Sequence, residues 1–177
     1  TPGYGLASAL MSIINGVDIL DTVILNFSGG PAAPSFELVQ VFCDKLGIET
    51  GVNREAVAKI NRELKHIREE LADFDSNRTF PREFDIANYK LPTEVDEMFD
   101  RAIEAAKGNQ PFQLLEYTHD INRYFHFPEP NDNVREAQIP GGMYTNMLAQ
   151  LKAAKMENEL TKVLETVPGV RIDSGVP

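Results

Sequence analysis

The chain has 177 residues, 42% of them hydrophobic, and carries a formal net charge of −10 and a single cysteine, Cys43. This composition is that of a folded globular protein, and the negative charge argues against a nucleic-acid partner because phosphates would be repelled. The lone cysteine cannot form an internal disulfide, and no apolar run approaches the roughly 20 residues of a membrane span, so we expect a cytoplasmic protein.

The first third of the chain predicts the order helix, strand, helix. Apolar residues at helical spacing predict a helix over residues 6–14. The run Val17–Leu25 is short and rich in β-branched residues, and Ser28-Gly29-Gly30-Pro31 closes it, as expected of a strand buried on both faces. A second helix begins after Ser35 and ends at Gly47.

A long helix is predicted to follow Asn53, which is a suitable N-cap residue. Its apolar residues alternate at steps of three and four and form one stripe. The members of this stripe are Val57, Ile60, Leu64, Ile67, Leu71 and Phe74. We expect the stripe to be at least partly buried against another helix.

The second half of the chain predicts further helices separated by loops. Residues 75–90 show no clear period and are expected to form a loop. Helical patterns cover about residues 93–106 and 112–125. An extended link is predicted from residue 128 to Ile139, and a last helix is predicted between about residues 147 and 164.

The single predicted strand bears on how the chain is organised. A strand buried on both faces needs hydrogen-bonding neighbours on each side, because unpaired N–H and C=O groups are costly in an apolar environment. No second strand is predicted, so Val17–Leu25 either pairs with another polypeptide or belongs to a piece of a longer one. We expect a mainly α structure in which Val17–Leu25 is the only long strand, with edges that are exposed or paired to another chain.

Two stretches of the chain resemble the carboxyltransferase domain of biotin-dependent enzymes such as pyruvate carboxylase, the oxaloacetate decarboxylase α chain and the pyruvate-side subunit of transcarboxylase. The first comprises Thr1-Pro2-Gly3, Gly16-Val17-Asp18-Ile19-Leu20-Asp21-Thr22 and the loop Ser28-Gly29-Gly30. The second is Gln138-Ile139-Pro140-Gly141-Gly142-Met143-Tyr144-Thr145-Asn146-Met147. Its Ile-Pro-Gly-Gly-x-x-x-Asn element is the most specific signal.

This resemblance implies that the chain corresponds to the C-terminal portion of the family only. Residues 1–52 would form the last βα segment of a (β/α)8 barrel, and residues 53–90 would begin the helical C-terminal cap domain. Residues 133–177 would be the conserved segment of that cap, which contains the Ile-Pro-Gly-Gly motif. Residues 91–132 are interpreted as a helical insert that matches nothing in the family.

The resemblance also implies a reaction and its cofactors. The complete enzyme would move CO2 between carboxybiotin and a 2-oxo acid such as pyruvate or oxaloacetate, at the mouth of the barrel. Biotin would be presented by a biotin carboxyl carrier domain, and a divalent metal such as Zn, Mn or Co would stabilise an enolate. A His-x-His pair of metal ligands is expected immediately upstream of Thr1, so no metal is expected on this chain alone. Other expected partners are the missing N-terminal barrel portion and a second copy in a homodimer.

The loop that carries the proton shuttle in this family departs from the family pattern here. The pattern Ser-Gly-x-Thr-x-x-Pro-Ser reads Ser28-Gly29-Gly30-Pro31-Ala32-Ala33-Pro34-Ser35, so a proline that cannot transfer a proton occupies the threonine position. Ser28 and Ser35 are therefore the catalytic candidates, as a proton shuttle or a biotin contact, with a helix N-cap as the alternative role for Ser35. Gly29, Gly30 and Pro31 form the expected substrate and biotin loop, with a simple tight turn as the alternative.

Two further features complete the candidate site. Gly141 and Gly142 would let the chain enter the active-site funnel, or they form a hinge before the last helix. His66, His119 and His126 are not expected to form a metal site, because such a site needs three or four convergent ligands. The first hypothesis is therefore a carboxyltransferase fragment that is inactive alone, and the alternative is a non-catalytic structural or dimerisation module derived from the same family.

Overall fold

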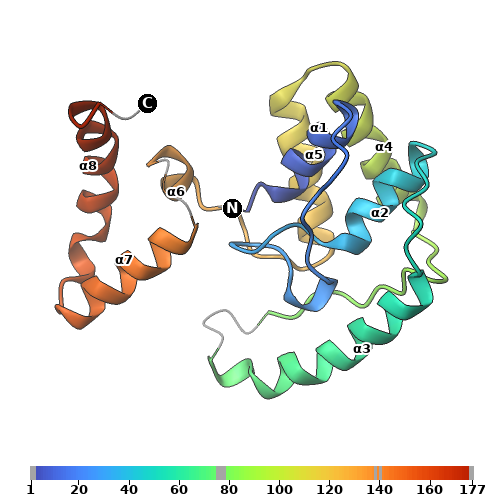
Figure 1. Cartoon of the computed structure of the whole chain (residues 1–177), viewed down its shortest axis with the longest axis horizontal. Helices are drawn as coiled ribbons and strands as arrows, with labels where there is room; N and C mark the ends of the chain where they lie inside the picture. Colours follow the sequence, from blue (N-terminus) through green and yellow to red (C-terminus); the bar gives the residue numbers. More distant parts are fainter. Residues whose placement is uncertain (1–2, 75–78, 138, 140, 176–177) are drawn as a thin grey trace. The chain divides into compact units, whose positions relative to one another are not determined.

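The computed structural model describes residues 3–74, 79–137, 139 and 141–175 (Figure 1). The chain divides into two compact units, Gly3–Glu129 and Pro130–Pro177. Over the described ranges it is helical or irregular, and it contains no β-strand but only one isolated parallel bridge, between Val23 and Ser35. The mainly α expectation is confirmed for these residues. The finer division into barrel segment, cap start, insert and conserved segment stays a prediction.

The larger unit is built mostly from the helices that the sequence predicts. Its elements are α1 (Gly5–Ile14), η1 (Leu25–Phe27), α2 (Phe36–Lys45), α3 (Arg54–Glu70), η2 (Ala72–Phe74), α4 (Thr93–Lys107) and α5 (Pro111–Tyr124). Asn53 caps α3 as expected, since its side chain accepts a hydrogen bond of 3.0 Å from the backbone N–H of Ala56. The loop predicted up to residue 90 is confirmed for residues 79–90, while residues 75–78 lie outside the described residues.

One apolar core holds α1, α2, α4 and α5 together. Helices α4 and α5 pack against each other, and both contact α1. The rings of Phe42 in α2 and Phe99 in α4 are fully buried, with centroids 4.9 Å apart. The region interpreted as an insert is thus part of the same core as the region that resembles the family.

The predicted strand Val17–Leu25 is not formed, which corrects the sequence-based expectation. Within the described residues, the backbone of residues 18–22 makes no backbone–backbone hydrogen bond. Within the predicted strand, Val23 forms a β-bridge: its N–H donates to the carbonyl of Pro34 at 3.1 Å and its carbonyl accepts from the N–H of Phe36 at 2.9 Å. A β-branched run needs a neighbouring strand to form a ladder, and the described residues supply none. Ile19 is accordingly 83% exposed.

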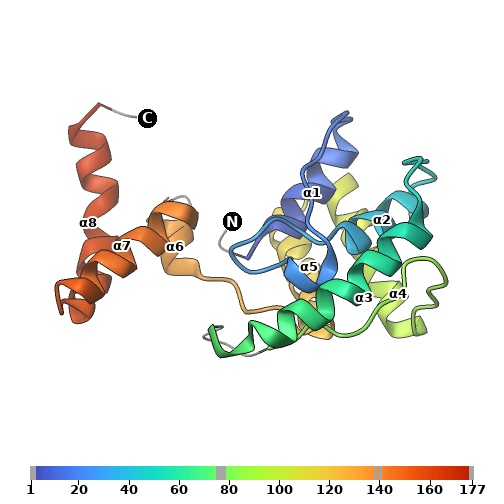
Figure 2. The same ribbon diagram turned by 60° about the horizontal axis from the view of Figure 1, so that its bottom comes forward.

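The expected burial of the α3 stripe against another helix is wrong for most of its residues. Helix α3 packs on η1 through a different edge, where Ala58 and Asn61 are buried. Four of the six stripe residues are exposed, namely Ile60, Ile67, Leu71 and Phe74. The polar side chain of Asn61 bonds to Asn26 within η1, and this turns the apolar stripe toward solvent. Figure 2 shows α3 running along the outside of this unit.

The smaller unit contains two longer helices where the sequence predicts one. Its elements are α6 (Asp132–Glu136), α7 (Gly141–Ala153), η3 (Glu157–Glu159) and α8 (Leu160–Asp173). The predicted extended link therefore includes a short helix, and the predicted last helix is interrupted near Lys155, whose φ of 57° is left-handed and incompatible with a continuous helix. A small cluster of Ala137, Ile139 and Leu164 joins α6 to α8. Among the described helices of the chain, none is both long and apolar enough to cross a membrane.

Candidate functional site

The glycine-rich loop between η1 and α2 is closed at its base and turned at its tip. The bridge between Val23 and Ser35 closes the base. At the tip, the N–H of Gly29 donates to the carbonyl of Ala33 at 3.2 Å. Gly29 and Gly30 have φ angles of 81° and 53°, a left-handed conformation that glycine adopts with little strain. The tight-turn description of the paired glycines is therefore accurate, whatever further role the loop has.

Gly29 also permits a close approach between this loop and the segment that follows α5. A Cβ atom at Gly29 would lie 2.8 Å from Cγ of Phe127 and closer still to Cδ1. A Cβ atom at Gly30 would lie 3.3 Å from Cγ of Pro128. Carbon atoms pack favourably at about 3.5–4.0 Å, so a side chain at Gly29 does not fit. The tip of the loop therefore rests on the last residues of the region interpreted as an insert.

A cavity of about 250 Å³ lies beside the loop. Ser28, Gly29 and Pro31 line one side of it, and Arg68 of α3 and His126 after α5 are also part of its lining. The structure thus brings three of the predicted loop residues to one hollow. Arg68 and His126 are not recognisable from the sequence as neighbours of this loop, because nothing local in the sequence shows that α3 and the end of α5 meet it.

The two candidate serines lie in different surroundings. Ser28 is 7% exposed and lines the cavity, and its Oγ donates a hydrogen bond of 2.9 Å to the carbonyl of Leu25. Ser35 is 2% exposed, and its Oγ donates to Oε2 of Glu37 at 2.8 Å. Ser35 occupies the N-cap position of α2 but makes no side-chain capping bond. Of the two, Ser28 is therefore the serine that faces an open space.

Glu37 links both ends of the loop from within the core. Its Oε2 accepts hydrogen bonds from the Ser35 hydroxyl and, at 2.9 Å, from the N–H of Leu25. Its Oε1 is buried and has no hydrogen-bond partner. Burial raises the pKa of the Glu37 carboxyl above its ordinary value, although the hydrogen bonds from its own backbone, Ser35 and Leu25 act in the opposite direction.

This raised pKa predicts a pH dependence that Glu37→Gln removes. Because the folded state binds the proton more tightly than the unfolded state, Glu37 contributes most stability below its ordinary pKa of 4.5 and loses it as the pH rises toward the folded value. We expect the free energy of unfolding of the parent chain to fall relative to Glu37→Gln as the pH increases above 4.5. Urea unfolding of both chains at several pH values measures this difference, and a constant difference would contradict the prediction.

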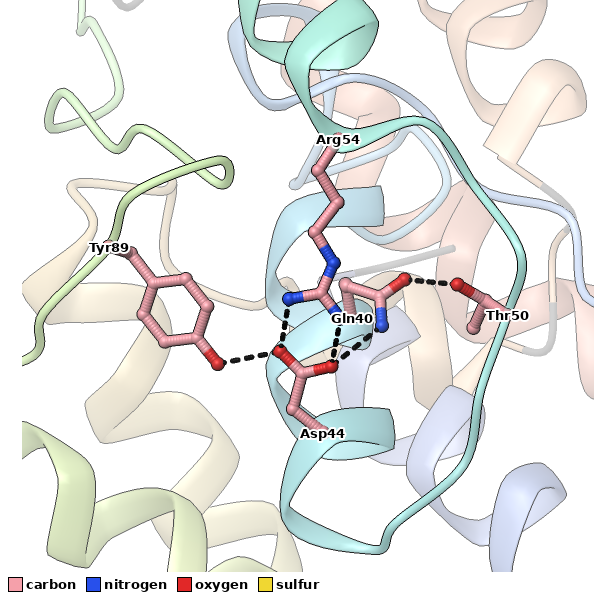
Figure 3. Close-up of polar contacts among 5 residues, drawn as sticks. All are labelled: Gln40, Asp44, Thr50, Arg54 and Tyr89. Atoms are coloured by element: carbon pink, nitrogen blue, oxygen red, sulfur yellow. Dashed lines mark hydrogen bonds and ion pairs between the residues drawn. The ribbon is translucent and has the colours of Figure 1, made fainter.

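A second polar cluster ties α2 to the start of α3 and to the loop before α4 (Figure 3). Asp44 of α2 accepts hydrogen bonds from Gln40 at 2.9 Å, from Nη1 of Arg54 at 2.7 Å and from the Tyr89 hydroxyl at 2.8 Å, and Nη2 of Arg54 forms a further short contact. Thr50 donates to Oε1 of Gln40 at 2.6 Å. Partial burial alone would raise the pKa of Asp44, but the bonds from Arg54, Tyr89 and Gln40 outweigh it and lower the pKa. This cluster joins three segments of the larger unit and contains none of the predicted site residues.

Comparison with known proteins shows similarity to carboxylases and carboxyltransferases. Residues 134–177 match the model of the conserved carboxylase domain. The chain is 26% identical over 177 residues to the methylmalonyl-CoA carboxyltransferase 5S subunit of Propionibacterium freudenreichii subsp. shermanii, a match that covers 100% of this chain and 25% of the relative. The chain therefore resembles the carboxyltransferase and carboxylase subunits of the biotin-dependent family, as its sequence motifs imply.

Two further proteins similar to this chain are the large subunit of a 2-oxoglutarate carboxylase and one of the subunits of a pyruvate carboxylase. The first, from Hydrogenobacter thermophilus, is 22% identical over 175 residues, which cover 99% of this chain and 19% of the relative. The second, from Methanothermobacter thermautotrophicus, is 26% identical over 162 residues, which cover 92% and 20%. The chain thus spans 19–25% of the length of these relatives. No solved structure is significantly similar to it.

The match to the 5S subunit covers the whole chain, so residues 91–132 lie within a region aligned with a carboxyltransferase. Of the second stretch that carries the resemblance, Gln138 and Pro140 lie outside the described residues, as do Thr1 and Pro2 of the first. Gly141 and Gly142 open α7, and a Cβ atom at Gly142 would meet no atom within 4 Å. Their roles in a funnel or a hinge remain predictions.

The three histidines of the chain have separate partners. His66 lies 3.7 Å from Glu69, His119 pairs with Glu129, and Nε2 of His126 lies 3.4 Å from Arg82. Among the described residues, no group of three His, Cys, Asp or Glu side chains is placed to hold a metal ion. The metal of the family is therefore not assigned to these residues.

Proposed function

We propose that the chain is part of a biotin-dependent carboxyltransferase that moves CO2 between carboxybiotin and a 2-oxo acid, and that it is inactive alone. The match of residues 134–177 to the conserved carboxylase domain carries this proposal. Support comes from relatives whose names describe a carboxyltransferase and carboxylases. Because the chain covers at most 25% of these relatives, the activity belongs to a longer protein, in which a barrel portion and a biotin carboxyl carrier domain are the proposed partners.

Within this proposal, the loop over residues 28–35 forms one wall of the biotin and substrate site. Pro31 has no hydroxyl, so Ser28 or Ser35 takes the role of proton shuttle or biotin contact. Ser28 is the favoured candidate because it lines the cavity, and its oxygen can still accept a hydrogen bond while it donates to Leu25. Ser35 would first have to give up its buried bond to Glu37. Biotin would supply the transferred carboxyl group, and a divalent metal, whose ligands are proposed to lie upstream of Thr1, would supply Lewis-acid stabilisation of the enolate.

The 177-residue chain is expected to show no oxaloacetate decarboxylation above background with free biotin and added metal. Metal-assisted enolate formation and general acid–base proton transfer each contribute substantially to rate, the latter typically about 10²–10⁴-fold, and this chain lacks the predicted metal ligands. The full-length gene product should be active. In the full-length protein, Ser28→Ala should lower turnover more than Ser35→Ala if Ser28 is the shuttle.

Unchanged turnover in both serine variants would remove the serine assignment. Measurable turnover by the 177-residue chain would show that the active site does not need the metal ligands predicted upstream of Thr1, and would contradict the proposed site.

The alternative is a structural or dimerisation module that has lost the chemistry of the family, and Pro31 at the shuttle position favours it. The encoded residues immediately upstream of Thr1 separate the two functions. A His-x-His pair there, with a lysine and an Arg-Asp pair further upstream, favours the enzyme. Their absence favours the module.

A further inference from the structure

The apolar stripe that runs along α3 to its C-cap Leu71 and to Phe74 in η2 is mostly exposed, although its pattern is that of a helix-packing surface. The six residues from Val57 to Phe74 are spaced by three, four, three, four and three, which is the spacing of the core positions of a coiled coil. Ile60 and Ile67 are each 47% exposed, and Phe74 is 86% exposed. We call this stripe the seam. A seam of such regular spacing can pack against a second helix, because the side chains of that helix fit into the gaps between the side chains of the seam.

The charges beside this seam are unequal on its two sides. Because successive residues of a helix are turned by about 100°, Asn61 and Arg68 flank the seam on the side that packs on η1. Glu63 and Glu70 flank it on the opposite side, and both are exposed. Lys59 lies further around the helix. On the side of the seam that faces away from η1, the residues nearest to the seam are therefore the two carboxylates of Glu63 and Glu70.

These carboxylates disfavour a second copy of the same chain as the occupant. In a symmetric antiparallel pair with Leu64 facing Ile67 of the second copy, Glu63 of each copy would lie beside Glu70 of the other, and like charges at such positions are destabilising. A parallel pair would direct the same carboxylates toward the edge that η1 already covers. The spacing of the seam therefore favours packing against a helix, whereas the carboxylates of Glu63 and Glu70 disfavour packing against a second copy of the chain.

We propose that this face of α3 binds a helix of a partner protein that combines an apolar seam with Lys or Arg residues on its flank. The apolar side chains of the partner cover Ile60, Leu64 and Ile67, and its cations pair with Glu63 and Glu70. This assignment rests on α3 alone and does not depend on the proposed carboxyltransferase activity.

The test uses two synthetic helical peptides of about 21 residues, long enough for helices to form in isolation. Both carry the same apolar seam, one with Lys and the other with Glu at the flanking positions. The 177-residue chain should bind the Lys peptide about tenfold more tightly at low salt, because two attractive pairs replace two repulsive ones. High salt should reduce this preference. The double variant Glu63→Lys/Glu70→Lys should reverse it.

Variants of the seam supply the matched controls. Ile60→Glu and Ile67→Glu change exposed residues, so circular dichroism should show a folded chain that no longer binds the Lys peptide. Phe112→Glu alters a residue of α5 that is 83% exposed and outside the seam, and it should leave binding unchanged. Equal affinity for both peptides, or binding that survives Ile60→Glu, overturns the proposal. A wild-type dimer in sedimentation that Ile60→Glu dissociates would instead identify the occupant as a second copy.

Discussion

Gly29→Ala is expected to lower the free energy of unfolding by about 2–5 kcal/mol. A left-handed backbone costs a residue with a Cβ about 1–2 kcal/mol, and forcing an extra carbon into a packed site costs about 1–3 kcal/mol. Both costs apply here, because φ is 81° and the new Cβ would overlap the ring of Phe127. That ring is 7% exposed and has little room to move aside. Urea unfolding followed by far-UV circular dichroism measures the loss.

Gly16→Ala is the matched control for this prediction. Gly16 has a φ of 79°, but a Cβ atom there would meet nothing within 4 Å. Its substitution should therefore cost only the backbone strain of about 1–2 kcal/mol. Adding Phe127→Leu to Gly29→Ala should give a smaller loss than the sum of the two single changes, since the shorter side chain relieves the overlap. Equal costs for both glycine substitutions would show that the loop does not rest on Phe127.

The helices of the larger unit are predictable because their signals are local. Asn53 is recognisable as an N-cap from its place before a periodic run, and its side chain does bond to the N–H of Ala56. Gly47 is recognisable as the residue after the second helix, and its φ of 70° is the left-handed conformation expected there. Capping and periodicity act over a few residues, so one sequence is enough to find them.

The predictions of the strand and of the burial of the α3 stripe are wrong because both depend on distant partners. Residues 17–25 have strand composition, but composition cannot provide the neighbouring strand. The seam of α3 has the pattern of a buried face, yet the bond between Asn61 and Asn26 turns a different edge inward. Tertiary contacts between residues 35 positions apart thus decide which side of the helix is buried.

The surroundings of the candidate site also depend on residues that are distant in the sequence, and the sequence pattern does not reveal them. The family pattern places Ser28, Gly29 and Pro31 in one loop, and all three line one cavity. The pattern gives no sign of Phe127 against Gly29 or of Glu37 beneath Ser35. Glu37 looks like an ordinary polar residue in the first turn of a helix, but α2 is buried over residues 37–43, and only the packing of the other helices makes this carboxyl part of the core.

Asp44→Asn is expected to cost about 2–3 kcal/mol at neutral pH, discounted for the partial exposure of Arg54. Each polar contact that Asp44 accepts comes from a donor, namely Gln40, Arg54 or Tyr89. The amide nitrogen of asparagine would place a further donor against these groups, so the new side chain loses bonds as well as charge. Asp100→Asn is the control, because Asp100 bonds to Lys45 at 2.8 Å with its side chain 57% exposed, and an exposed pair contributes about 0–1 kcal/mol.

The lowered pKa of Asp44 adds a pH dependence with a defined sign. Because the folded state holds this carboxylate more firmly than the unfolded state does, its contribution is complete above the ordinary pKa of 3.8 and is lost as the pH falls through the folded value. The difference in free energy of unfolding between the parent chain and Asp44→Asn should therefore shrink on acidification. Glu37 acts in the opposite direction over higher pH values, so the two substitutions should change the pH profile with opposite slopes. A difference for Asp44→Asn that stays constant down to the acid limit of folding would show that Asp44 gains nothing from its charge in the folded state.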